Sequence, residues 1–370
     1  MKRCRVAVAG LGFVGHVHFE NLRRVPGIDV CAIVDVDPNR LKRYQDEYSI
    51  THAYTDWRDL LADSLIDVIH DCTPNFTHFE INHAFLNEGV GVVSEKPLTL
   101  TVHEGEQLCS LAQKSGLLNA VCFNYRFFPL VQHMKALIHE GAIGDVRMLS
   151  GSYLQDWLLY STDYDWKVAP RDGVLTRAIA DIGSHWLDLA QFLTGEKVVE
   201  VFADLQTFIP FRTPHIEGHN EHPPVKIDTE DAGSLLLHLQ NGISATVVVS
   251  QIAAGRKNRL DIEVNGSEGS LYWNQEEPNS LWLGRRSNPS QLILDDPQLL
   301  RQKSFASYPG GHNEGWADAQ RLMFESIYHS DESMGDGARF PTFLDGLSTV
   351  RIENAAFQSS AARKWVQIEP

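Results

Sequence analysis

The sequence predicts an α/β protein in two parts: a doubly wound parallel sheet over residues 1–125, then an α+β domain with a mostly antiparallel sheet over 126–370. Three observations support this prediction. Short apolar segments alternate with amphipathic ones in the first third, a glycine-rich turn follows the first of them, and longer alternating segments with a hairpin signal fill the second part. The length of 370 residues also favours two domains.

The overall composition narrows the class of protein. A net charge of −16, from 32 basic and 48 acidic residues, argues against binding nucleic acid or anionic membranes through net charge. The basic start "MKRCRVAVAGLGFVG" mimics a signal peptide, but its glycines and the helical segment after it do not fit one. Five cysteines without C-x-x-C spacing predict thiols rather than disulfides. We therefore expect a cytoplasmic protein.

The first predicted element is a strand over 5–9, and "GLGFVG" follows it at once. Gly10, Gly12 and Gly15 have the G-x-G-x-x-G spacing and open a predicted helix. The first glycine permits a tight turn, the second lets a pyrophosphate approach the backbone, and the third lets the helix pack closely. The helix N-terminus offers N–H groups to the phosphates. The pattern predicts a Rossmann dinucleotide site, with a glycine-rich turn of an unrelated α/β protein as the alternative.

The second predicted strand, 28–35, bears on the choice of cofactor. It ends in Asp35, twenty residues after Gly15. A carboxylate there accepts hydrogen bonds from an adenosine ribose and repels a 2′-phosphate, which favours NAD over NADP. Arg40 leaves NADP open, because a nearby guanidinium can accommodate that phosphate.

Further strands are predicted at 66–73, 90–94 and 117–124, separated by helices. Ligands of such sheets bind at the carboxyl ends of the strands, so 73–75, 95–97 and 124–126 should line one crevice, with Lys96 pointing at a ligand rather than into the core. The residues predicted to bind the cofactor are Gly10, Gly12, Phe13, Val14, Gly15, Asp35, Arg40, Thr73, Pro74, Asn75, His78, Glu95, Lys96, Asn124 and Arg126.

The second part begins with a predicted helix over about 129–140. Residues 232–251 predict a hairpin, in which Asn241-Gly242 suits a tight primed turn. Residues 259–266 alternate strictly and should bury every second side chain. Short strands follow, and helices near 314–329 and 343–362 close the chain. Together they predict the mostly antiparallel sheet, with one apolar side.

The segment "ADIGSHWLDLAQFLTG" (180–195) predicts one helix that stops at Gly195. Asp181 and His185 are four residues apart and so share a helix face. A carboxylate that orients an imidazole can move protons near neutral pH. The alternative is an N-terminal aspartate favoured by the helix dipole and a histidine satisfied in the core.

Five motifs occur in one order: "GLGFVG", "TPNFTH" (73–78), "EKP" (95–97), "NYRFFP" (124–129) and "DIGSHWLDL" (181–189). With them the chain resembles the glucose–fructose oxidoreductase / inositol dehydrogenase (Gfo/Idh/MocA) family nearly end to end. The resemblance implies a Rossmann domain, then a domain with an open, mostly antiparallel sheet that often joins subunits into a homodimer or homotetramer. It also implies catalytic Lys96, Asp181 and His185, and a cis peptide at Lys96-Pro97.

The resemblance further implies hydride transfer between a nicotinamide and a secondary alcohol of a sugar, anhydrosugar or cyclitol. His185 would take the hydroxyl proton, Asp181 would hold the ring, and Lys96 would stabilise alkoxide character, although Lys96 and His185 could exchange roles. Aromatic faces beside carboxylates suit a polyhydroxylated ring, but they could also be loop residues around a core. The residues predicted to contact the substrate are Lys96, Tyr153, Asp156, Trp157, Trp166, Asp181, His185 and His312.

Other functions stay open at this stage. The segment "HIEGHNEH" (215–222) could bind a divalent ion, but the prolines around it favour a loop, and His16 and His18 should point to different faces of their helix. We therefore predict no metal. A non-catalytic sensor that binds the dinucleotide is a further alternative, as is a reductase of an aldehyde, a dihydrodiol or an imine.

Overall fold

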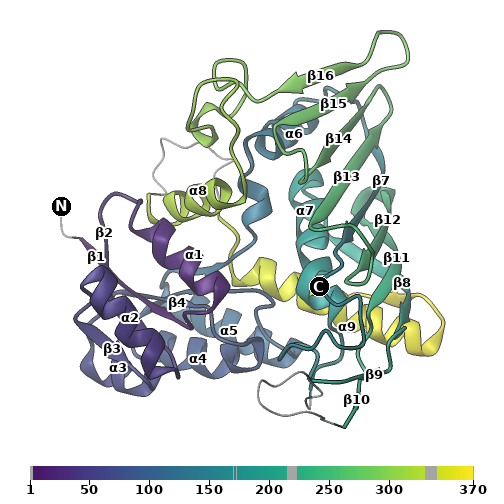
Figure 1. Ribbon diagram of the computed structural model, residues 1–370. Helices are drawn as coiled ribbons and strands as arrows, with labels where there is room; N and C mark the ends of the chain where they lie inside the picture. Colours follow the sequence, from purple (N-terminus) through teal and green to yellow (C-terminus); the bar gives the residue numbers. More distant parts are fainter. Residues whose placement is uncertain (1–2, 170, 172, 215–222, 330–339, 370) are drawn as a thin grey trace. The chain divides into compact units, whose positions relative to one another are not determined.

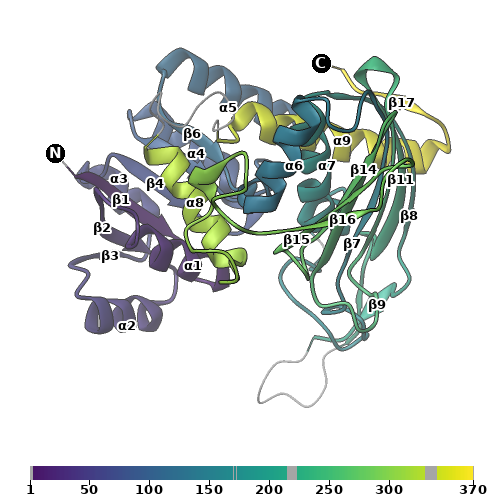
Figure 2. The ribbon, with the colours of Figure 1, turned by 90° about the horizontal axis from the view of Figure 1, so that it is seen from above.

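The computed structural model describes residues 3–169, 171, 173–214, 223–329 and 340–369 (Figures 1 and 2). The chain forms two compact units: residues 1–127 with 315–350, and residues 128–314 with 351–370. The histidine-rich segment considered above as a metal site lies outside the described residues. Within the part of the chain that the structure describes, no helix is both long and apolar enough to cross a membrane.

The first unit contains a six-stranded sheet in the order β3-β2-β1-β4-β5-β6, and its pairings are parallel. This arrangement confirms the predicted Rossmann sheet. The strands are β1 (Cys4–Ala9), β2 (Ile28–Val34), β3 (His52–Tyr54), β4 (Val68–Asp71), β5 (Gly91–Ser94) and β6 (Asn119–Val121). The helices between them are α1 (Phe13–Leu22), α2 (Pro38–Tyr48), α3 (Trp57–Asp63), α4 (His78–Asn87) and α5 (Val102–Ser115).

Local sequence signals fix the helix ends of this unit. The Asp37 side chain accepts a hydrogen bond at the start of α2, and Pro38 takes the first helical position. Thr101 and Glu104 form a capping box at the start of α5. The central strands are largely buried, which explains why most of their residues are apolar, although β4 also buries the polar His70 and Asp71.

Two later segments complete the first unit. Helix α8 (Trp316–Tyr328) and the first part of α9 (Phe343–Ala362) belong to it, although the predicted division at residue 125 assigned them to the second part. Helix α8 packs on α1 on one side of the sheet, with α4 and α5 on the other (Figure 1). Phe324 of α8 and Phe343 of α9 are fully buried, and this apolar packing is the physical reason for the assignment.

The second unit contains a nine-stranded sheet in the order β16-β15-β14-β13-β7-β12-β11-β8-β17. Only β12 and β7 pair in parallel, so the predicted mostly antiparallel sheet is confirmed. The strands are β7 (Val146–Leu154), β8 (Val198–Gln206), β11 (Ala232–Leu239), β12 (Ser244–Ser250), β13 (Arg259–Gly266), β14 (Ser270–Asn274), β15 (Ser280–Gly284), β16 (Gln291–Leu294) and β17 (Val366–Gln367). A separate pair joins β9 (Phe211–Arg212) to β10 (Val225–Lys226).

The hairpin between β11 and β12 turns as predicted. Asn241 and Gly242 both have positive φ, 58° and 76°, as a primed turn requires. One face of the sheet packs on α6 (Pro129–His139) and α7 (Ser184–Thr194), and Leu260, Ile262 and Val264 are fully buried there. The predicted alternation of β13 is therefore confirmed.

The opposite face of this sheet exposes apolar side chains. The cross-strand register places five apolar side chains on that face, and each of them is more than two-fifths exposed. They are Met148 on β7, Leu236 on β11, Val248 on β12, and Leu292 and Leu294 on β16.

Candidate active site

The glycine loop joins β1 to α1 and is shaped by steric limits. Gly10 has φ +81°, and a Cβ there would lie 2.6 Å from the carbonyl oxygen of Cys72. A Cβ on Gly15 would lie 1.7 Å from the carbonyl oxygen of Gly10, whereas one on Gly12 would meet nothing within 4 Å. The first and third glycines are thus required by the fold, and the second leaves open space in front of the backbone.

Asp35 lies directly after β2 and is tied to the glycine loop. Its Oδ2 accepts a hydrogen bond of 2.7 Å from the backbone N–H of Leu11. Arg40 donates to both carboxylate oxygens, at 2.9 and 3.1 Å. In the sequence, Arg40 left NADP as an alternative cofactor. Its guanidinium faces the Asp35 carboxylate, and this pairing reduces its availability to a 2′-phosphate.

Phe13 is strongly exposed, with 78% of its surface accessible. Its ring stacks on Trp316 at the start of α8, with centroids 5.8 Å apart and planes at 10°. The neighbouring Val14 is half-buried. Trp316 was not among the residues predicted to bind the cofactor. It lies beside Phe13 because α8 packs in the first unit.

His78, at the start of α4, joins two of the predicted cofactor loops. Its Nδ1 lies 2.8 Å from the carbonyl oxygen of Pro97, and its Nε2 lies 3.0 Å from that of Thr73. Carbonyl oxygens only accept, so a ring nitrogen of His78 that carries a proton donates to one of these two loops. Burial raises the pKa of the nearby Asp71 carboxyl, and the charge of His78 opposes that rise. His78 thus braces the loops after β4 and β5.

Neighbouring residues of these loops are held by local hydrogen bonds. The Thr73 hydroxyl donates to Asp71 at 2.6 Å, and Pro74 precedes a 3₁₀ turn, η1 (Asn75–Thr77). Asn124 and Arg126 lie in another 3₁₀ turn, η2 (Asn124–Phe127), after β6. Arg126 donates to Asp345 of α9 at 3.0 Å. Sheet order sets these loops side by side at the carboxyl edge, as the sequence predicted.

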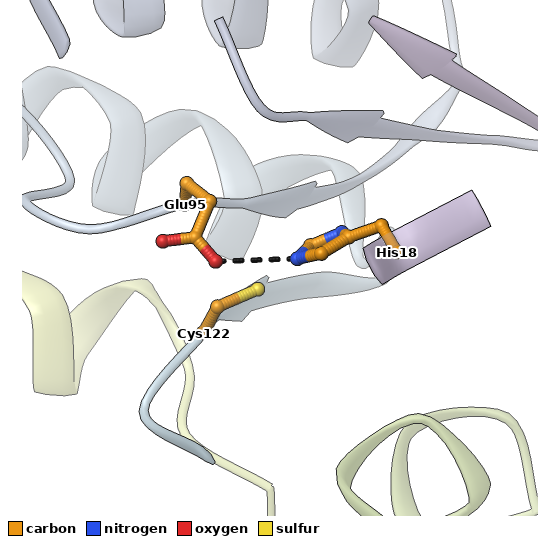
Figure 3. Close-up of side chains that lie close together, drawn as sticks. All are labelled: His18, Glu95 and Cys122. Atoms are coloured by element: carbon orange, nitrogen blue, oxygen red, sulfur yellow. Dashed lines mark hydrogen bonds and ion pairs between the residues drawn. The ribbon is translucent and has the colours of Figure 1, made fainter. Parts of the chain in front are cut away.

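Lys96 follows β5, and its peptide bond with Pro97 is cis, which confirms that prediction. The preceding residue, Glu95, accepts from the backbone N–H of Lys96 at 3.1 Å and contacts His18 Nε2 at 3.2 Å (Figure 3). His16 instead contacts Tyr44 at 2.6 Å, so the two histidines of α1 face different partners, as predicted.

A buried chain of polar groups continues from His18. Its Nδ1 lies 3.0 Å from His70 Nδ1, and His70 Nε2 lies 2.7 Å from the Tyr328 hydroxyl. Burial lowers the pKa of His70 well below its ordinary value, so this ring is neutral. When Tyr328 donates to His70, His70 to His18, and His18 to Glu95, every donor meets an acceptor. We assign these tautomers, which keep Glu95 a hydrogen-bonded carboxylate beside Lys96.

Metal binding is chemically conceivable at one place within the described residues. Ligand atoms of His18, Glu95 and Cys122 lie within 4.8 Å of one another (Figure 3). Burial, with Glu95 adding to it, raises the pKa of the Cys122 thiol well above its ordinary value, whereas a metal binds the thiolate. The hydrogen-bonded chain accounts for these positions, and we assign no metal to them.

Asp181 and His185 lie in the second unit, where the structure refines the prediction. The helix over 184–194 ends at Gly195 as expected, but residues 179–183 form a π-helical turn, η3 (Ile179–Gly183). Glu230 accepts hydrogen bonds from the backbone N–H groups of Arg177 and Ile179 at the entrance to this turn. Such turns are frequent at functional sites. His185 is buried, and its ring centroid lies 6.2 Å from that of Tyr153.

Asp181 has two strong partners that the sequence did not indicate. Its Oδ1 accepts from Lys167 Nζ at 2.8 Å, and its Oδ2 accepts from Gln251 Nε2 at 2.9 Å. Lys167 lies in an irregular segment, where no periodicity connects it to Asp181. Gln251 directly follows β12. The sequence predicted this strand, but it did not indicate that the residue after it would contact Asp181.

The predicted substrate residues occupy varied environments. The Tyr153 hydroxyl donates to Asn258 at 2.8 Å, and Asp156 accepts from Lys257 at 2.8 Å. The hydrogen bond from Lys257 lowers the pKa of Asp156. Trp157 and Trp166 are each about two-fifths exposed, and both flank Lys167. His312 is exposed, and its Nδ1 lies 3.0 Å from the carbonyl oxygen of Pro309.

The loop that carries His312 is stabilised by a buried carboxylate. Glu314 accepts hydrogen bonds from the backbone N–H groups of Ser307 and Tyr308. Asp295 is buried close by, and burial, with a smaller effect of Glu314, raises its pKa to about 6.

We expect Asp295→Asn to stabilise the protein at pH 8 and to leave its stability unchanged near pH 3. The folded pKa of about 6 exceeds the ordinary 3.8, so the wild type loses stability as pH rises between these values. The loss amounts to at most about 3 kcal/mol, and the asparagine avoids it. Urea unfolding at both pH values measures the difference. The exposed Asp145→Asn is the control, and an equal effect at both pH values would contradict the assignment.

The residues of the first unit fit a dinucleotide. The glycine loop leaves space where a pyrophosphate would approach, the N-terminus of α1 presents its N–H groups there, and Asp35 lies at the end of the neighbouring strand. These groups occupy the positions that the phosphates and the adenosine ribose of such a cofactor require.

Comparison with known proteins agrees with this reading. Residues 4–123 match the model of an oxidoreductase family with an NAD-binding Rossmann fold, and residues 131–272 match the GFO/IDH/MocA C-terminal domain. The chain is 27% identical to levoglucosan dehydrogenase of Pseudarthrobacter phenanthrenivorans, over all of this chain and 99% of that enzyme. It is also 27% identical to myo-inositol 2-dehydrogenase of Thermotoga maritima, over 72% and 74% of the two chains.

A solved structure of levoglucosan dehydrogenase in complex with NADH and L-sorbose superposes with a TM-score of 0.90 at 26% identity, and each chain is covered completely. The matches span both units, and the resemblance inferred from the five motifs is confirmed. The chain belongs to the Gfo/Idh/MocA family of NAD-binding oxidoreductases.

Proposed function

We propose that this chain oxidises a secondary alcohol of a sugar, an anhydrosugar or a cyclitol with NAD, or runs the reverse reduction. The observation that supports the proposal most strongly is the set of Lys96, Asp181 and His185 within a chain of this family. Lys96 follows a strand at the carboxyl edge of the cofactor sheet, Asp181 lies in the π-helical turn η3, and His185 lies in the first turn of α7. The relatives named for levoglucosan and myo-inositol support the substrate class.

In the proposed mechanism, NAD supplies the hydride acceptor when it is bound. The imidazole of His185 accepts the proton of the substrate hydroxyl as the carbon–hydrogen bond breaks, and becomes an imidazolium. Asp181 keeps the ring oriented and stabilises its charge. The Lys96 ammonium donates a hydrogen bond to the same oxygen, where negative charge develops. The chain thus removes one proton for each hydride transferred.

Substrate binding is proposed for the aromatic and carboxylate side chains of the second unit. Tyr153, Trp157 and Trp166 would contribute ring faces, and Asp156 and His312 would contribute polar atoms. We also propose that the loops after β4, β5 and β6 contact the cofactor, as predicted from the sequence. The orientation of Arg40 toward Asp35 supports NAD over NADP.

The experiment is a screen of initial rates with NAD and NADP across inositols, aldoses and anhydrosugars. We expect NADH formation with at least one of these polyols, and a kcat/KM for NAD at least about tenfold above that for NADP, since Asp35 repels the 2′-phosphate. Binding of NAD without turnover anywhere in the panel would favour a sensor. NADPH-dependent reduction of an aldehyde, a dihydrodiol or an imine would favour the other alternative.

We further propose a homo-oligomer formed through the exposed face of the nine-stranded sheet. Its apolar side chains, among them Leu236 and Val248, support an interface there. Light scattering of the intact chain measures the mass of the assembly. A cytoplasmic location belongs to the same proposal, and it is supported by the five cysteines, which are thiols.

A further inference from the structure

We propose that Lys167 is a positioning residue for the pair of Asp181 and His185: its ammonium fixes the Asp181 carboxylate against Gln251 and offsets the carboxylate charge, so that His185 is available as a base. The inference rests on the proposed function, because it concerns how that base is tuned. It adds a residue from an irregular segment to a site that the sequence motifs describe without it.

One side of Asp181 is held by a rigid partner. Gln251 is fully buried, and its Oε1 accepts from Arg177 Nη1 at 2.7 Å. A guanidinium only donates, so the amide oxygen of Gln251 must face Arg177 and its Nε2 must face Asp181. Arg177 is itself bonded to the buried Asp231. The amide therefore cannot turn, and it fixes the position of Oδ2.

The other side of Asp181 is held by an adjustable charge. The Lys167 side chain is one-third exposed, and its Nζ lies 2.8 Å from Oδ1. The same Nζ lies 5.7 Å from the ring centroid of Trp157 and 5.8 Å from that of Trp166, within the range of cation–π attraction. These contacts retain the ammonium at the carboxylate.

The backbone of Lys167 is anchored as well. Its N–H donates to the Asp165 carboxylate at 3.0 Å. The next residue, Val168, is buried in a small apolar cluster with Leu158 and Ile227. The ammonium is thus presented from a fixed point of the chain, which a positioning role requires.

The remaining charges near this pair do not provide the same compensation. Arg177 is a cation, but its guanidinium bonds to Gln251 and to Asp231, and burial raises the pKa of the neighbouring Glu230. Other ionisable groups near the pair include Tyr153 on β7, Asp165 in the segment of Lys167, and Asp188 one turn after His185 on α7. Lys167 is a cation that bonds directly to Asp181.

The consequence for proton transfer follows from the charges. An uncompensated Asp181 carboxylate attracts a proton to the neighbouring imidazole, and a protonated ring cannot act as a base. With Lys167 in place, part of that attraction is cancelled, and the ring is neutral at lower pH. Removal of the ammonium should therefore displace the acid limb of the pH profile to higher pH.

The test compares the pH dependence of kcat/KM for the wild type, Lys167→Met and Lys167→Arg with the best polyol of the screen. We expect the acid limb of Lys167→Met to move up by roughly one pH unit, with little change in the KM for NAD. Lys167→Arg should retain the wild-type limb, because it keeps the charge. Lys226→Met, which removes an exposed ion pair of 2.7 Å with Asp228 in the same unit, is the matched control.

An unmoved limb in Lys167→Met would overturn the inference, and so would an equal displacement in Lys167→Arg. Thermal unfolding shows whether each variant is folded, and Lys167→Gln is the second neutral variant. An NMR titration of the His185 imidazole, assigned from the signal lost in His185→Asn, gives a readout without turnover. A wild type inactive on every polyol contradicts the proposed function alone, because the titration midpoint still tests Lys167.

Discussion

Lys96→Met lowers kcat by about a hundredfold to a thousandfold, and His185→Asn lowers it by a similar or larger factor, while the Kd for NAD changes less than about threefold. Both side chains are proposed to act on the substrate hydroxyl, one by donating to the developing charge and the other by removing the proton. Each interaction strengthens in the transition state, so its loss appears in kcat rather than in cofactor binding. Steady-state kinetics and fluorescence titration with NADH measure the two quantities.

The double variant adds a second criterion for this pair. Groups that serve one proton and one oxygen act as a unit, and removing both then costs much less than the product of the single effects. Lys114→Met, an exposed lysine at the end of α5, is the control and should leave kcat unchanged. Retention of more than about a tenth of kcat by either single variant would reject its assignment.

Asp231→Asn reduces the free energy of unfolding of the second unit by about 3–5 kcal/mol. Asp231 is fully buried, accepts from Arg177 and Arg212, and binds the backbone N–H of Ile209 at 2.8 Å. The amide removes the negative charge and leaves two buried guanidinium groups without compensation. Urea unfolding measures the loss, and the transition of each unit should be followed separately, since a chain with two units need not unfold in one step.

Arg212 explains why the expected loss is large. It is fully buried, and besides Asp231 it donates to the carbonyl oxygens of Leu158, Tyr160 and Asp163. The network therefore ties the loop after β7 to the start of β11. Asp228→Asn, whose partner Lys226 is exposed, should cost less than about 1 kcal/mol. Equal destabilisation by the two variants would contradict the role given to the buried network.

Sequence periodicity was sufficient to predict the sheets. The strand positions of the first third and the alternation of β13 depend on local burial, which the order of apolar residues records. The edge that carries Lys96 then followed from the rule that parallel strands end together. These features need no knowledge of distant contacts.

Features that depend on distant contacts could not be predicted. The π-helical turn before α7 is bonded at its entrance by Glu230, about fifty residues later, so α-helical spacing alone suggested a regular helix. The ion pair of Lys167 with Asp181 joins an irregular segment to this turn. The membership of 315–350 in the first unit has no local signal either, because it is decided by packing on α1.

That discontinuity has a consequence for how the protein is made. The rings of His18 and His70 pack against Phe324, and His70 bonds to Tyr328, so the nucleotide-binding half lacks part of its interior until α8 has been synthesised. Residues 128–314 must therefore be translated before the first unit can complete its fold. A fragment that ends at residue 127 would lack α8 and would expose His18 and His70 to water. We therefore expect this fragment to be less stable than the first unit of the intact chain.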